Sequence, residues 1–102
     1  MNLKEIGKNL DLPWSYETLG SDEALEIKLV RYYGEYPRHS HDGDQFMLVI
    51  EGEVEIEIEG EIHKLSEMDF FHIPAHKMHR PIAKKGSIVL VIWRKGIRTT
   101  TE

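Results

Sequence analysis

The sequence predicts an all-β protein with one domain, a barrel or sandwich of about eight short strands. From residue 24 onward, apolar residues recur with a period of two, which is typical of β-strands. Turn residues, often glycine, separate these runs, and no segment has the pattern of a long helix. A chain of 102 residues is long enough to bury a single core.

The first 23 residues form a lead-in rather than part of the barrel. Apolar residues at helical spacing predict one short helix within residues 2–10: Leu3, Ile6 and Leu10. Asn2 and Glu5 resemble a capping box at its start. We expect the remainder of the lead-in, which includes Pro13 and Gly20, to be irregular.

The predicted barrel covers residues 24–94. A first strand runs from residue 24 to Gly34, and a second covers residues 45–51. The second strand has apolar side chains on both faces, which indicates a central strand packed on two sides. Further strands are expected at 53–59, 62–65, 70–73, 79–83 and 87–93, the last two divided by a turn at Lys85-Gly86. We expect the tail, residues 95–102, to be mobile or to lie along an edge.

Composition excludes several classes of partner. The chain has 13 basic and 18 acidic residues, a net charge of −5, and no basic cluster longer than Lys84-Lys85. We therefore expect neither nucleic acid nor a membrane surface as a partner. The longest apolar runs, 46–50 and 88–92, are too short to span a bilayer, so a cytoplasmic protein is expected. With no cysteine, neither disulfides nor thiolate metal sites can form.

Histidines indicate a metal site. His39 and His41 are separated by two positions, so in a strand both point to the same face. Gln45 is also an even number of positions from His39, so its side chain can share that face if the strand continues. His79 begins another strand directly after a turn at Pro74. Three imidazoles with one oxygen donor suit zinc, iron, nickel or copper. The alternative is that His39 and His41 are exposed loop residues.

The remaining candidates have simpler interpretations. His63 and His76 are expected at the surface, and His72 is expected to lie away from the site. Arg31 can either face an anionic ligand or extend to the rim of the barrel. The four aromatic residues expected in the core are Phe46, Phe70, Phe71 and Trp93.

Two segments resemble the paired motifs of the cupin superfamily. The first contains Gly34, His39-Ser40-His41, Gln45 and Gly52; the second contains Asp69, Pro74, His76 and His79. The resemblance covers about residues 24–94. The lead-in and the ending also resemble those of small single-domain cupins described as mannose-6-phosphate-isomerase-like.

This resemblance implies a jelly-roll barrel holding one divalent metal ion (Zn, Fe, Ni, Mn or Cu) through His39, His41, Gln45 and His79. Three positions depart from the motifs. Gln45 replaces a glutamate, Met68 replaces the glycine that opens the second motif, and His76 replaces the glycine within it. A neutral amide leaves the full charge of the ion, which favours Lewis acidity but weakens metal retention. The Cβ of His76 is expected to alter its turn.

The expected function is to act on, or to bind, a small oxygen-rich molecule such as a sugar or a carbonyl acid. Two alternatives stay open, an iron-type dioxygenase and a small-ligand module without turnover, and so does a vestigial site. The sequence does not decide whether the protein is an enzyme. We expect a homodimer, because small cupins usually pair and the lead-in carries apolar side chains with little local structure to cover them.

Overall fold

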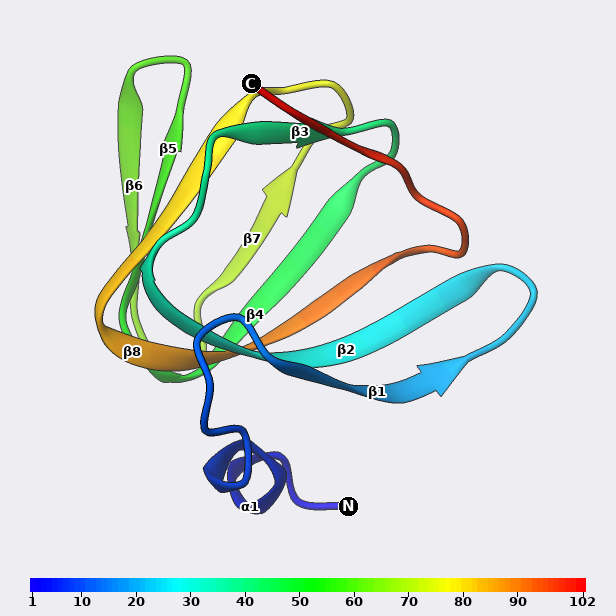
Figure 1. Cartoon of the computed structure of the whole chain (residues 1–102), viewed down its shortest axis with the longest axis vertical. Helices are drawn as coiled ribbons and strands as arrows, with labels where there is room; N and C mark the ends of the chain where they lie inside the picture. The colour runs from blue at the N-terminus through cyan, green and yellow to red at the C-terminus, as the bar shows by residue number, and fades with distance from the viewer.

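The computed structural model describes all 102 residues, as one short helix and nine strands. The elements are α1 (Leu3–Lys8), β1 (Tyr16–Ser21), β2 (Leu25–Glu35), β3 (His39–His41), β4 (Gln45–Gly52), β5 (Val54–Ile58), β6 (Glu61–Leu65), β7 (Phe70–Ile73), β8 (His79–Arg94) and β9 (Thr99–Thr101). The strands pair antiparallel and curl into a half-barrel, with α1 outside the curl and β3 across its far side (Figure 1). The predicted all-β architecture is confirmed.

The longest strand, β8, joins the parts of the sheet. Its second half lies between β2 and β4, while its first half pairs with β5 and places His79 opposite His39 of β3. The sequence predicted two strands here, which was wrong. Gly86 adopts a φ of +84°, a left-handed conformation open to glycine, so the chain bends sharply without ending the strand.

The two faces of the sheet pack against different partners. The inner face forms the larger core cluster, which includes Met47, Val49, Ile56 and Val89. On the outer face, Leu29, Ile50 and Ile88 form a second cluster, and the apolar side of α1 covers it. The expectation that the strand at 45–51 is packed on both sides is therefore confirmed.

The helix is held by side chains at both ends. Asn2 accepts a hydrogen bond from the Glu5 amide, as the sequence predicted. At the other end, Arg31 donates to the carbonyls of Leu10 and Gly7 at 2.9 and 3.0 Å. Arg31 therefore links β2 to the C-terminal end of the helix and the residues just after it, and the expectation that it faces an anionic ligand or the rim was wrong.

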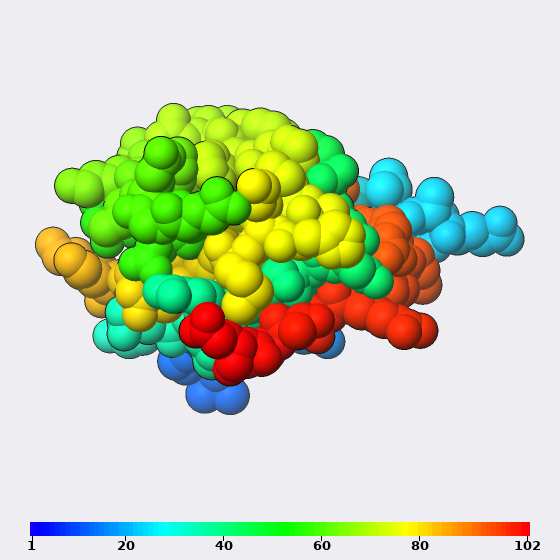
Figure 2. Space-filling model, turned by 90° about the horizontal axis from the view of Figure 1, so that it is seen from above, coloured from blue at the N-terminus to red at the C-terminus, as the bar shows by residue number.

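Two segments for which the sequence predicted no strand form strands at the two ends of the sheet order; for the tail, a position along an edge was one of the two expectations. Residues 16–21 pair with β2 along the edge of the sheet, and residues 99–101 pair with β3. Figure 2 shows the red C-terminal segment lying along the molecule beside the green segment that contains β3. Both strands are mostly exposed, so they lack the alternation of apolar residues that reveals a half-buried strand.

Most apolar side chains of the lead-in are covered within the chain. Leu3, Ile6 and Leu10 pack on the outer core cluster, and Trp14 packs on the inner one, whereas Met1, Leu12 and Tyr16 are exposed. The homodimer therefore stays a prediction with less support from these residues. No helix of the structure has both the length and the apolarity needed to cross a membrane.

Candidate metal centre

Three histidines from separate parts of the chain meet on the inner face of the sheet. Potential ligand atoms of His39, His41 and His79 lie within 4.8 Å of one another, and all three residues are buried. The pairing of β3 with β8 explains this arrangement, because His39 and His79 are direct cross-strand partners and His41 shares the face of His39. Nitrogen ligands around a tetrahedral ion are about 3.4 Å apart, so small side-chain shifts would complete the set.

A hydrogen bond orients each imidazole. The Nδ1 atoms lie 2.7 Å from the Pro37 carbonyl in His39, 2.9 Å from the Thr99 hydroxyl in His41, and 3.0 Å from the Lys77 carbonyl in His79. A carbonyl only accepts, so His39 and His79 carry their proton on Nδ1. Their Nε2 lone pairs are thereby free, which is the arrangement found around metal-bound histidines.

Burial keeps these rings neutral. Burial, with a smaller contribution from the neighbouring histidines, lowers the pKa of both His41 and His79 to about 4. Burial also lowers the pKa of His39, against a hydrogen bond to Pro37 that raises it. Since a protonated imidazole cannot bind a cation, the three rings are ready to act as ligands at neutral pH.

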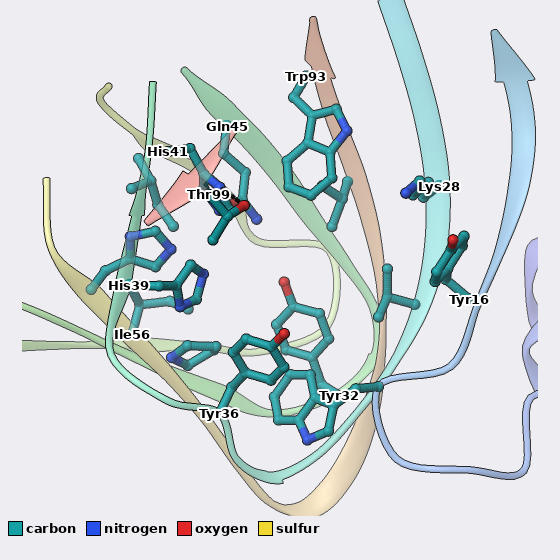
Figure 3. Close-up of a pocket in the computed structure, with 16 residues that line it drawn as sticks. Tyr16, Lys28, Tyr32, Tyr36, His39, His41, Gln45, Ile56, Trp93 and Thr99 are labelled. Carbon is teal, nitrogen blue, oxygen red and sulfur yellow. Dashed lines mark hydrogen bonds between the residues drawn. The ribbon is translucent and has the colours of Figure 1, made fainter. Parts of the chain in front are cut away.

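Gln45 lies beside the three histidines. It is buried at the start of β4 and lies beside His41 and Tyr32, whose pKa values it influences. The expectation that His39 and Gln45 share one face along a continuous strand was wrong, because β3 ends at His41 and residues 42–44 belong to no strand. The amide nevertheless faces the same cavity as the histidines (Figure 3).

Backbone contacts join the two histidine segments. The His76 amide donates to the His41 carbonyl at 2.7 Å, and the Ala75 amide donates to Asp44 at 2.9 Å. His76 has a φ of +68° and Met68 a φ of +71°, so the backbone of both residues adopts the left-handed conformation that favours glycine. The turn thus accommodates a Cβ in the left-handed conformation.

A cavity of about 220 Å³ opens next to the histidines. Its walls are mainly apolar and aromatic, and Tyr32 and Tyr36 point their hydroxyl groups into it (Figure 3). Burial raises the pKa of Tyr32 to about 12, so this phenol remains protonated and can donate a hydrogen bond. No aspartate or glutamate lines the cavity.

Several cavity residues were not found from the sequence. Trp14 packs against Tyr32 and Tyr36 with ring centroids 4.8 and 4.9 Å away. Lys28 and Thr99 also line the cavity. The alternation in β2 places Lys28 and Tyr32 on the same face, but only the fold shows that this face is the inner one.

The other candidates lie away from the centre, as expected for the histidines. His72 and His76 are exposed; the ring of His72 stacks on Phe46 and lies 3.3 Å from Asp44. His63 lies on β6 beside Glu61. Of the aromatic residues expected in the core, Phe71 and Trp93 pack against the inner core cluster, and Trp93 also lines the cavity, whereas Phe70 is exposed.

A family model described as the cupin domain matches residues 30–93. The chain belongs to the cupin family. The match spans both histidine segments, and the curled antiparallel sheet agrees with it. Comparison with curated proteins finds no match.

Several solved structures share this fold. A cupin-2 domain protein from Shewanella frigidimarina is 26% identical, with a TM-score of 0.84 over 90% of this cupin and 91% of that chain. A hydroquinone 1,2-dioxygenase from Sphingomonas, with 4-hydroxybenzoate bound, is 16% identical, with a TM-score of 0.81 over 93% and 73%. A sugar phosphate isomerase from Silicibacter pomeroyi is 20% identical, with a TM-score of 0.73 over 85% and 64%. For the two enzymes the likeness shows the fold alone, because the same fold supports different reactions.

Proposed function

We propose that this cupin binds one divalent metal ion through His39, His41 and His79, with Gln45 as the fourth ligand, and that the ion binds an oxygen atom of a small molecule. The observation that supports this most is the convergence of three buried, neutral imidazoles, each oriented through Nδ1. A donor set of three nitrogens and an amide oxygen fits Zn, Fe, Ni, Mn or Cu.

The chemistry of the cavity narrows the choice of ligand. A divalent ion here would supply Lewis acidity to a bound carbonyl or hydroxyl oxygen. The protonated Tyr32 phenol can donate a hydrogen bond to the same ligand, and aromatic side chains form much of the cavity wall. A sugar would leave several hydroxyls without partners against these walls, at a cost of roughly 1–3 kcal/mol for each. The apolar lining therefore favours a carbonyl acid or another flat molecule over a sugar.

Elemental analysis of gently purified protein tests the proposed site. We expect about one equivalent of metal in the wild type and strong loss in His39→Ala, His41→Ala and His79→Ala. His72→Ala and His76→Ala serve as matched controls, because these histidines are exposed. Unchanged metal content in the first three variants would overturn the assignment.

A second candidate is an iron-dependent dioxygenase at the same residues. It is favoured by the aromatic cavity and by the fold shared with the hydroquinone dioxygenase. Oxygen uptake after anaerobic loading with ferrous iron, with hydroquinone as substrate, would support it. Binding of hydroquinone with no oxygen uptake would instead favour a binding module without turnover, consistent with a cavity that has no carboxylate base.

A further inference from the structure

Lys28 is the one lysine in the cavity wall, which contains no arginine, aspartate or glutamate. It projects from β2, on the opposite side of the cavity from His39 and His41 (Figure 3). Its side chain is only 17% exposed, which is unusual for a lysine without a role in pairing or binding. One end of the cavity therefore has the histidines that are proposed to bind a metal cation. The other end has a cation of the protein itself, the Lys28 ammonium.

Neighbouring groups hold the ammonium in place. Its Nζ atom lies 4.0 Å from the centroid of the Tyr16 ring and 5.5 Å from that of Trp93, so it contacts two aromatic faces. Glu26 lies 3.4 Å from Nζ and also accepts a hydrogen bond from the Trp93 indole at 3.0 Å. An ammonium has three donors, so pairing with one carboxylate leaves donors for a ligand.

The simpler interpretation is an ion pair between Lys28 and Glu26 that only stabilises the surface of β2. Ion pairs elsewhere in this chain, such as Lys4 with Glu67 and Lys77 with Glu59, are much more exposed and do not line this cavity. Lys28 differs from them because it is largely buried and borders the cavity that contains the histidines. This position favours a ligand-binding role.

The size of the cavity limits what can lie between the two ends. About 220 Å³ is less than the roughly 300–1,000 Å³ of pockets that take drug-sized ligands. A single ring or a short conjugated chain suits this volume. The aromatic walls formed by Trp14, Tyr36 and Trp93 favour a flat body over a puckered one.

We propose that Lys28 is the anion-binding residue of the cavity, and that the ligand is a small, flat carboxylate with an oxygen donor at its opposite end. The carboxylate pairs with the Lys28 ammonium, the flat body contacts the aromatic walls, and the second oxygen faces the histidines. Only the contact at the histidine end rests on the proposed metal site.

Matched acids and amides test this proposal. We would measure binding of 3- and 4-hydroxybenzoate, and of the corresponding hydroxybenzamides, to the zinc-loaded and metal-free proteins by calorimetry. Trp14 and Trp93 provide a second readout through their fluorescence. The wild type should bind at least one acid about tenfold or more tightly than its amide, since a hydrogen bond to a charged group contributes roughly 1.5–3 kcal/mol. Equal affinities, or no binding by any acid, would overturn the proposal.

Substitutions of opposite effect sharpen the test. Lys28→Met should remove the preference for acid over amide, and Lys28→Arg should retain it. Glu26→Gln keeps a partner for the Trp93 indole but removes the competing charge, so it should strengthen acid binding. Lys64→Met changes an exposed lysine on β6 and should have no effect. Equal weakening of acid and amide in Lys28→Met would indicate a structural role and contradict the proposal.

Metal content separates the two proposals. Lys28→Met should keep its metal, because Lys28 lies across the cavity from His39 and His41 (Figure 3). If the wild type binds no metal, the proposed metal site fails, while the preference of the metal-free protein for acid over amide still tests Lys28. If metal binds and no preference is found, the role of Lys28 fails alone.

Discussion

The hydroxyl of Thr99 lies 2.9 Å from Nδ1 of His41, although 58 positions separate the two residues. The pairing of β9 with β3 creates this contact, since His41 and Thr99 are direct cross-strand partners. A segment near the end of the chain thus orients one of the proposed metal ligands. Asp42 strengthens the attachment by accepting a hydrogen bond from the Arg98 amide at 2.8 Å.

Replacement of Thr99 should weaken metal binding without removing a ligand. Thr99→Val keeps the shape of the side chain but leaves His41 Nδ1 without its partner, so we expect a loss of about 10–100-fold in metal affinity. Thr99→Ser should restore most of it. Titration against a competing chelator measures both, and Thr100→Val, at an exposed position of β9, is the control. Unchanged affinity in Thr99→Val would show that this contact does not support the site.

Gln45→Glu should raise the affinity for metal and lower the stability of the metal-free protein. A carboxylate would cancel one charge of a divalent ion, so we expect metal affinity to rise about tenfold or more. In the metal-free protein the same carboxylate would be buried beside Tyr32 and His41, and the melting temperature should fall. Chelator competition and thermal unfolding of both forms provide the measurements. A fall in metal affinity would indicate that Gln45 is not a ligand.

The metal-free protein should lose stability as the pH falls from about 6.5 to about 4.5. The pKa values of His41 and His79 are lowered to about 4, so the unfolded chain binds more protons than the folded chain in this window. We expect a loss of roughly 1–3 kcal/mol from each histidine by the time the pH approaches 4. Carboxylates whose pKa values are lowered, such as Asp42 and Glu57, lose their contribution only at lower pH.

Urea unfolding across this pH range measures the effect. His79→Gln should reduce the slope of unfolding free energy against pH, because one of the groups with a lowered pKa is removed. A free energy of unfolding that does not change between pH 6.5 and 4.5 would contradict the prediction. Bound metal should shift the loss to lower pH, since protons must then displace the ion.

Two glycines with nearly the same backbone conformation should respond differently to alanine. Gly52 has a φ of +86° and Gly60 a φ of +84°, so each substitution costs about 1–2 kcal/mol for conformation. At Gly52 the new Cβ would also lie 2.6 Å from the Gly86 carbonyl oxygen, whereas at Gly60 nothing lies within 4 Å. We expect Gly52→Ala to cost about 1–3 kcal/mol more in unfolding free energy than Gly60→Ala. Equal costs in urea unfolding would refute the steric explanation.

The sequence predicted the strands that bury one face, because alternation of apolar residues is a local property. It did not predict β1 or β9, whose exposed side chains carry no such pattern. It also placed a turn at Lys85-Gly86, where the structure bends a continuous strand. In that segment, pairing with β2 and β4 on one side of the bend and with β5 on the other outweighs the local turn signal.

For the candidate site, the sequence by itself determined which residue types and spacings suit a metal, namely His39, His41, Gln45 and His79. Only the tertiary structure decided that Lys28, Trp14 and Thr99 line the same cavity and that Arg31 does not. The physical reason is that a ligand motif depends on spacing along one strand, whereas a cavity wall depends on which face of each strand turns inward. Thr99 reaches His41 only through a strand pairing between distant segments, for which the sequence has no local signal.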